Sequence, residues 1–513
     1  GFMAQPADAA YSYRKAITIQ AGSVSGSVAD FPVLVSIASD NQLRTVANGG
    51  HVQNSNGYDI RFRAADGTTP LPHEIESYYP LTGQLTAWVK VPALSSSADT
   101  VIYMYYGDSG ITSLQENPAA VWDSTYKGVW HLNNSFSDST GTGNNASNSG
   151  TTDISGRFAQ GRDFDGTSNY VSTSSTELKT AEAFTISLWF KADTTSFARH
   201  LVWQGESGGN GWGGEQEMHL TLGNRNGGTS YNNYLTFLLG RSEASAGNPL
   251  SVSTAFSNTS NWHHAAVVVS GMGSSPSATL YLDGAARGSD TGTTPDTSRT
   301  SWNTGFRLGR PSAAERYFNG RMDEVRIATT NRPAAWITTE YNNQSSPDTF
   351  YGIGAEETIA APVYYQITAI AGTNGSIAPS GISMVESGTG KTFAVTPASG
   401  YKVSEVLVDG AAVTLTDGQY TFTNVNRDHE ISVSFVPLNT GVVVPPPSGL
   451  IPGCAMNISA NYSATGFDAA DFNLISVGVT ADKKLYLDTG YYAINPESIV
   501  IPSAAVPSSL STS

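Results

Sequence analysis

Apolar and polar residues alternate with a period of two along most of this chain. The segment LTAWVKV, residues 85–91, is typical, because Thr86, Trp88 and Lys90 separate Leu85, Ala87, Val89 and Val91. Successive side chains of a strand point to opposite faces, so this alternation predicts half-buried β-strands. Short runs of this kind recur between Gly, Asn, Asp and Ser residues, and few stretches show a sustained helical period. The pattern therefore predicts an all-β fold made of β-sandwiches.

Length and charge narrow the possibilities further. The chain has 513 residues, too many for one hydrophobic core, so several domains are expected. Its net charge of −16, with no basic stripe, excludes nucleic acid as the expected partner and is compatible with divalent cations. The one cysteine, Cys454, cannot form an intrachain disulfide. No apolar run reaches the roughly 20 residues of a membrane span.

The first β-domain is expected at residues 10–118, after an N-terminal arm at residues 1–9. The arm contains Ala7-Asp8-Ala9, which fits a signal-peptidase site, although an ordinary flexible arm has the same composition. The domain carries the segments YRKAITI, YDIRFRAADG, LPHEIESYY and TVIYMYYGD, in that order. It resembles the bacterial DUF2341 family, whose members have similar opening, central and closing segments. The resemblance implies a β-domain and brings no known chemistry.

The second domain is expected at residues 119–356 and carries a series of short motifs. In chain order these are Phe164-Asp165-Gly166, Trp189, Trp262-His263-His264, Tyr281-Leu282-Asp283-Gly284 and Asp323-Glu324-Val325-Arg326. The ordered set resembles the concanavalin A-like, laminin-G-type jelly roll. That resemblance implies two packed sheets and a domain that binds ligands.

The last part of the chain divides into a third domain, a linker and a tail. Residues 357–437 resemble a small all-β repeat found in arrays on bacterial surface proteins, on the strength of Gly375-Ser376-Ile377 and VTPASGYKVSEVLVDG. Residues 438–453 include Pro445-Pro446-Pro447 and are expected to be an extended linker. Residues 454–513 contain β-prone runs and form either a partial domain or a segment that pairs with a second chain.

Two adjacent acids, Asp323 and Glu324, raise the question of catalysis, metal binding or structure. In a regular strand their side chains point to opposite faces, so they cannot act together on one substrate atom. Alternation places Glu324 beside Arg326, which predicts a structural ion pair. It places Asp323 on the apolar face with Val325 and Ile327, where a carboxylate needs a metal or hydrogen-bond donors.

Calcium is the candidate cofactor of this chain. In jelly rolls of the resembled superfamily, an aspartate that opens this late strand often binds structural calcium with loop carbonyls, so Asp323 is a candidate ligand. Hydrogen bonding to turn amides is the alternative. Asp138, in the polar loop DSTGTGNNASNSGTTD, is a second candidate, and a simple turn cluster is the alternative there.

A glycosidase would need a pair of suitably spaced carboxylates, and Glu215 and Glu217 are the nearest approach. They lie two residues apart, in a glycine-rich stretch, and the spaced E-x-D-x-x-E run of the related glucanases is absent from the sequence. The histidines do not show the spacing of a zinc hydrolase either. The sequence therefore predicts that the protein is not an enzyme.

Aromatic side chains in a Gly- and Asn-rich stretch are the candidate ligand contacts. These are Trp203, Trp212, Tyr231 and Tyr234. Flat rings beside amide groups can stack on sugar faces, which predicts a glycan or surface-protein ligand. Packing of the same rings under long loops is the alternative.

Together these features predict a secreted, non-enzymatic adhesion protein of a bacterial cell surface with a lectin-like jelly roll. Two alternatives stay open. One is a structural subunit of an extracellular filament or pilus-associated assembly, joined as a homo-oligomer through the C-terminal tail or the N-terminal arm. The other is an accessory carbohydrate-binding part of a larger glycan-degrading protein.

Overall fold

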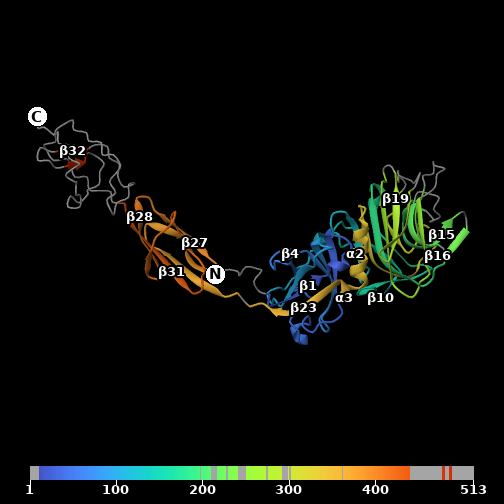
Figure 1. Cartoon of the computed structure of the whole chain (residues 1–513), viewed down its shortest axis with the longest axis horizontal. Coiled ribbons are helices and arrows are strands. Elements are labelled where there is room, and N and C mark those ends of the chain that lie inside the picture. The colour runs from blue at the N-terminus through green and yellow to red at the C-terminus, as the bar shows by residue number, and fades with distance from the viewer. Residues whose placement is uncertain are drawn as a thin grey trace. The chain divides into compact units, whose positions relative to one another are not determined.

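The computed structural model confirms the all-β prediction (Figure 1). It describes residues 11–438, except 197, 209–216, 227–228, 241–249, 273–274, 292–298, 300–301 and 361, together with 477–479 and 485–487. The chain divides into two compact units, residues 1–361 and residues 362–513. No helix in the described residues is long and apolar enough to cross a membrane.

The first β-domain consists of two antiparallel sheets. One has three strands in the order β2 (Val28–Ile37), β6 (Gln84–Leu94) and β5 (His73–Tyr79). The other has five in the order β23 (Tyr351–Thr358), β1 (Tyr13–Ile19), β7 (Thr100–Tyr106), β3 (Arg61–Ala64) and β4 (Pro70–Leu71). The predicted alternation of residues 85–91 is confirmed, since Leu85, Ala87, Val89 and Val91 belong to the core between these sheets.

One strand lies outside its predicted domain. Strand β23 falls mostly within the range 119–356 that the sequence assigned to the second domain, yet it completes the sheet of the first. Its residues Tyr351 and Ile353 pair with Ile19 and Ile17 of β1. The prediction was wrong here because the pairing joins segments more than 300 residues apart, which local periodicity cannot register.

The second β-domain is a two-sheet jelly roll. The back sheet follows the order β10 (Thr152–Ser155), β11 (Gln160–Asp165), β22 (Asn319–Ala328), β13 (Phe184–Ala192), β18 (His263–Ser270), β19 (Ser277–Leu282) and β20 (Ala285–Thr291), and β8 (Tyr126–Trp130) also pairs with β22. The front sheet follows the order β17 (Leu250–Ala255), β16 (Thr229–Leu239), β15 (Glu217–Asn226), β14 (Arg199–Gly205), β21 (Arg307–Leu308), β12 (Tyr170–Ser172) and β9 (Ser147–Ser149).

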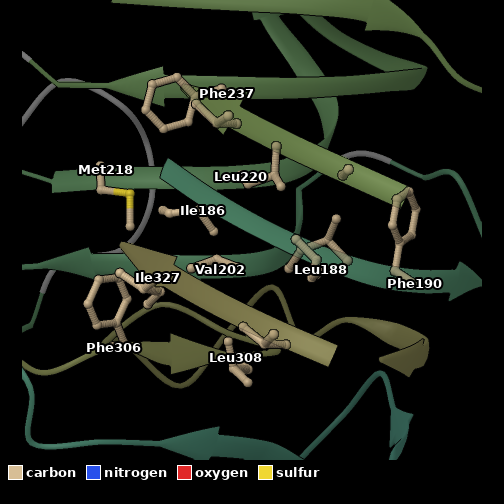
Figure 2. Packing of buried hydrophobic residues seen from close by; sticks show 14 of the residues in the cluster. Ile186, Leu188, Phe190, Val202, Met218, Leu220, Phe237, Phe306, Leu308 and Ile327 are labelled. Atoms are coloured by element: carbon tan, nitrogen blue, oxygen red, sulfur yellow. The ribbon is translucent and has the colours of Figure 1, made fainter. Parts of the chain in front are cut away.

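The core of the jelly roll lies between its two sheets. Figure 2 shows Ile186, Leu188 and Phe190 of β13 packed against residues of the front sheet, among them Val202, Leu220 and Phe237. These side chains are fully buried. Burying a Leu, Ile or Phe side chain contributes about 1.5–3 kcal/mol, so this core is the main source of stability of the domain.

The two β-domains pack against each other through aromatic residues and helix α2 (Ala334–Ser345). Trp88 projects from the outer face of β6 and is fully buried in a cluster with Trp122, Phe158 and Trp189. Helix α2 contacts both sides, because Asn343 hydrogen-bonds the backbone of β2 and Gln344 accepts a hydrogen bond from Trp189 (Figure 1). Two short helices complete the unit. Helix α1 (Pro118–Val121) lies between β7 and β8 in the chain, and α3 (Pro347–Phe350) lies between α2 and β23.

The second unit contains a small β-sandwich. One sheet has the order β26 (Gly381–Glu386), β24 (Tyr364–Ala371), β31 (His429–Pro437), β28 (Tyr401–Val408) and β29 (Ala411–Val413). The other has the order β25 (Gly375–Ala378), β27 (Lys391–Pro397) and β30 (Gln419–Phe422). Beyond residue 438 only β32 (Val477–Val479) and β33 (Leu485–Leu487) are described. The predictions for the arm, the linker, Cys454 and the rest of the tail lie outside the described residues.

Candidate functional site

The outer face of the front sheet carries the predicted contact residue Trp203. Alternation on β14 turns Val202 into the core and Trp203 outward, opposite His219 of β15 and Arg307 of β21. The indole is nevertheless fully buried, and its Nε1 donates to Oε2 of Glu217 at 2.9 Å. Trp203 is therefore a packed residue whose ring a ligand cannot reach in this conformation, which agrees with the alternative given for it.

The other predicted contact residues are only partly described. Tyr234 is half-buried on β16, and Tyr231 is described only through its backbone in the same strand. Trp212 and Glu215 lie outside the described residues. Glu217 is buried and accepts the indole hydrogen bond, so its carboxylate has a structural partner.

A buried histidine lies on the same outer face. His200 of β14 is 1% exposed, and its ring lies 4.8 Å from that of His219. Within the described part of the chain, neither of its ring nitrogens has a hydrogen-bond partner. Burial, and then the positive charges of His219 and Arg316, hold the pKa of His200 well below its usual range. The imidazole is therefore neutral in the folded protein at neutral pH.

We expect the contribution of His200 to the stability of the first unit to fall as the pH drops below about 6.5, the usual pKa of histidine. His200 takes up a proton near that pH when unfolded but only at much lower pH when folded, so the unfolded state binds more protons and is favoured by acid. His73 and His264, whose pKa values are also lowered by burial, act in the same direction.

Replacing His200 by phenylalanine removes this titration, so between about pH 6.5 and 5 the unfolding free energy of the variant should fall less, or rise more, than that of the wild type. Urea unfolding followed by tryptophan emission measures it, because all nine tryptophans lie at or before Trp336, in the first unit. His429→Phe, in the second unit, should leave the profile unchanged. Superimposable profiles for His200→Phe and the wild type would contradict the assignment.

A group of tyrosines and arginines lies around β12 and β21, towards the β9 edge of the front sheet. The guanidinium of Arg310 lies 3.9 Å from the ring centre of Tyr170 and 5.6 Å from that of Tyr317, and Arg307 lies 5.6 Å from Tyr170. Both tyrosines are half-buried, so part of each ring faces solvent. In the part of the chain that the structure describes, no carboxylate forms an ion pair with either arginine. We call Tyr170, Arg307, Arg310 and Tyr317 the tyrosine–arginine edge.

Sequence reasoning missed this edge, although a signal was available. The segment FRLGR, residues 306–310, alternates Phe306 and Leu308, which are buried in the core, with the cationic Arg307. A period of two across such a segment predicts an arginine on the outer face of a sheet. The stacking of Tyr170 and Tyr317 on Arg310 depends on segments far apart in the chain and gives no local pattern.

The acids Asp323 and Glu324 lie in β22, at a β-bulge. The register between β13 and β22 shifts there, and Glu324 has a left-handed backbone with φ of 53°. As a result Met322 and Val325 both face the core, while Asp323 lies opposite Trp189 on the other side of the sheet. The prediction that Asp323 shares the apolar face with Val325 was wrong, because the bulge resets the alternation.

The carboxylate of Asp323 is held by backbone amides. Its Oδ2 accepts hydrogen bonds from the N–H groups of Arg157 and Phe158 at 2.7 and 3.1 Å, and its Oδ1 accepts one from Glu324 at 2.9 Å. Burial, and then the charge of Glu324, raise its pKa well above the usual range. Asp138 likewise accepts hydrogen bonds from the amides of Val129 and Thr140. These are the alternatives given for both residues, and calcium binding at either stays a prediction.

The carboxylate of Glu324 is part of a buried cluster at the junction of the two β-domains. Its Oε2 accepts a hydrogen bond from Arg326 at 2.6 Å, as predicted, and its Oε1 lies 2.8 Å from Nδ1 of His131. Arg326 also donates to Glu340 of α2 at 2.6 Å. The nearby carboxylate charges, Glu324 foremost, outweigh burial and raise the pKa of His131 well above its usual value, so the imidazole is protonated here.

Comparison with family descriptions gives three matches in chain order. Residues 56–148 match the domain of unknown function DUF2341, residues 165–338 the concanavalin A-like lectin/glucanases superfamily, and residues 365–438 the divergent InlB B-repeat domain. The three sequence resemblances are confirmed. The first match extends beyond the predicted boundary at residue 118 and includes His131. No curated protein matches the chain.

Solved structures similar to this chain include several binding domains. Domain 4 of AbnA, a GH43 extracellular arabinanase from Geobacillus stearothermophilus solved with arabinotriose, is 18% identical over 42% of this chain and 97% of its own, with a TM-score of 0.34. The CBM40 of the Ruminococcus gnavus IT-sialidase, solved with sialyllactose, is 14% identical over 38% and 98%, with a TM-score of 0.27. The botulinum neurotoxin serotype D/C binding domain is 12% identical over 58% and 69%, with a TM-score of 0.33.

Proposed function

We propose that the chain is a non-enzymatic binding protein of a bacterial cell surface and that its jelly roll binds an acidic glycan at the tyrosine–arginine edge. The observation that carries the proposal is Arg310, which keeps 9% of its surface exposed, unlike Trp203, and stacks on two tyrosines that remain partly exposed. The match of residues 165–338 to the concanavalin A-like superfamily supports a binding role for this domain.

The chemistry of the edge favours a sugar that carries a carboxylate. Tyrosine rings offer flat apolar faces for the C–H side of a sugar ring, together with a hydroxyl that hydrogen-bonds. A guanidinium has several N–H donors in a fork that matches a carboxylate. Arg307 and Arg310 are close enough for the charge of Arg310 to lower the pKa of Arg307, second to burial. An anion bound between them would relieve this repulsion in a chain whose overall charge is −16.

The non-enzymatic part of the proposal is supported by the structural partners of the candidate acidic residues. Glu217 supports an indole, Asp323 accepts three amide hydrogen bonds, and Glu324 pairs with Arg326. The placement at a cell surface is supported by the matches to DUF2341 and to the B-repeat domain and by the resemblance of these regions to bacterial surface proteins.

We expect the full chain to bind glycans containing uronic or sialic acid more tightly than neutral glycans on a glycan array. Arg310→Gln removes a charge-assisted hydrogen bond and should weaken binding of the best ligand about tenfold or more. Tyr170→Ala should weaken it similarly by removing the stacking face. Isothermal titration calorimetry measures both, and the recovered glycan should be uncleaved.

Arg321→Gln is the matched control, because Arg321 is partly exposed on β22 of the other sheet and pairs with Asp163. It should bind as the wild type does. If Arg310→Gln binds the glycan with wild-type affinity and has an unchanged melting temperature, the tyrosine–arginine edge is not the binding site. Cleavage of the glycan by the purified protein would contradict the proposal that it is not an enzyme.

A further inference from the structure

The junction of the two β-domains contains a buried carboxylate oxygen without a partner. Glu76 projects from β5, and its side chain is 0% exposed. Its Oε2 accepts a hydrogen bond from Nε1 of Trp88 at 3.0 Å and lies 3.6 Å from Nδ1 of His131. Its Oε1 is buried and has no hydrogen-bond partner among the residues that the structure describes. An unsatisfied buried carboxylate oxygen is costly, so its presence requires an explanation.

The side chains around Glu76 are arranged as a set of metal ligands. Glu76, His131 and Glu324 each offer one donor atom, and these atoms lie within 4.8 Å of one another. Ligands of a tetrahedral ion with bonds of about 2.0–2.2 Å stand about 3.3–3.6 Å apart. The separations of 2.8 Å from His131 Nδ1 to Glu324 and 3.6 Å to Glu76 bracket that spacing. Small side-chain movements would close the set around an ion.

The charge of the cluster also favours a cation. Glu74, Glu76, Glu324 and Glu340 bring four carboxylates to a region whose positive partners are Arg326 and His131.

A small cavity of about 120 Å³ lies beside the cluster, on the side of Glu76 and His131. Glu74, Glu76 and His131 line it together with Ser135, Ser137 and Ser139. A water molecule takes about 30 Å³ in the liquid, so the cavity has room for an ion and water. The imidazole donor argues against calcium, which takes oxygen ligands, and favours a first-row divalent ion such as zinc.

We propose that Glu76, His131 and Glu324 bind a zinc ion that joins the first β-domain to the jelly roll. Glu76 comes from the first β-domain, His131 from the segment that follows β8, and Glu324 from β22 of the jelly roll. The ion thus cross-links the domains at the point where they pack. This site lies on different residues from the tyrosine–arginine edge and is independent of glycan binding.

Zinc titration of the metal-free full chain tests the proposal. Calorimetry should give saturable one-to-one binding, and the melting temperature followed by tryptophan emission should rise by on the order of 3–6 °C at 100 times the dissociation constant. Mg²⁺ should produce no comparable rise, and excess Ca²⁺ should not abolish the rise caused by zinc. No saturable zinc binding by the wild type would overturn the proposal.

Glu76→Gln separates a metal ligand from a structural acid. The amide keeps an oxygen for Trp88 and removes the uncompensated charge, so the metal-free melting temperature should be unchanged or higher. The zinc-induced rise should disappear. Glu177→Gln, at an exposed position of the same unit, should retain it. A full zinc-induced rise in Glu76→Gln would contradict the assignment.

Cobalt gives a test that does not depend on a variant. Co²⁺ bound to the wild type by one imidazole and two carboxylates should produce visible ligand-field absorption that zinc abolishes on competition. If Glu76→Gln fails to fold, the Co²⁺ spectrum of the wild type still tests the metal site. The absence of an absorption band that zinc abolishes would overturn the proposal.

Discussion

Replacement of Arg326 by leucine is expected to lower the unfolding free energy of the first unit by about 3–5 kcal/mol, the cost of leaving a buried ion pair without one partner. Arg326 is 2% exposed, and its guanidinium bridges Glu324 of β22 and Glu340 of α2 with hydrogen bonds of 2.6 Å each. It also stacks 4.2 Å from the ring centre of Trp88. Leucine fills part of the space, leaves Glu340 without its cation and leaves Glu324 with His131 alone.

Urea unfolding monitored by tryptophan emission measures this loss. Arg321→Leu is a matched control on the same strand, because its side chain is 30% exposed and its pair with Asp163 spans 3.5 Å. Exposed pairs contribute about 0–1 kcal/mol, so Arg321→Leu should cost no more than that. Equal losses for the two variants would mean that Arg326 does not hold the junction together.

Much of the fold could be predicted from the sequence, because periodicity is a local property. The alternation in residues 85–91 gave the correct core side chains of β6, and the ordered motifs gave the correct families in the correct order. The ion pair of Glu324 with Arg326 also follows from alternation, since both side chains lie on one side of the strand.

What could not be predicted depends on contacts between distant segments. Trp88 occupies a position expected to face solvent on a half-buried strand, yet the jelly roll covers it. The bulge at Glu324 gives no sequence signal, because a residue other than glycine adopts the left-handed backbone there, and it moves Asp323 to the opposite side of the sheet. His131 and Glu76 meet Glu324 only because two domains pack together.

The candidate ligand contacts illustrate the same limit. Trp203 is a candidate contact because it is aromatic and lies in a Gly- and Asn-rich stretch. This composition does not determine whether an aromatic ring is buried, and Trp203 is buried. Tyr170 and Tyr317 come from segments almost 150 residues apart and become neighbours of Arg310 only in the folded sheet. Composition can indicate that a domain binds something, whereas the contact surface depends on topology.

Asn343→Leu is expected to produce the second large effect, a loss of about 2–6 kcal/mol of unfolding free energy. Asn343 is fully buried on α2, and its side chain both accepts a hydrogen bond from the N–H of Leu34 at 2.7 Å and donates one to its carbonyl at 3.0 Å. Leucine has a similar volume but leaves two buried backbone groups of β2 unsatisfied, at about 1–3 kcal/mol each.

The neighbouring residue supplies the control for this prediction. Asn342 is half-buried and donates one hydrogen bond, to the carbonyl of Ser23 at 2.9 Å, so Asn342→Leu should cost about 1 kcal/mol. Because Asn343 joins α2 to β2, its replacement should also speed proteolysis between the two β-domains, whereas that of Asn342 should not. If both variants unfold at the same urea concentration, α2 does not fasten the jelly roll to the first β-domain through Asn343, and the aromatic cluster around Trp88 must hold the junction instead.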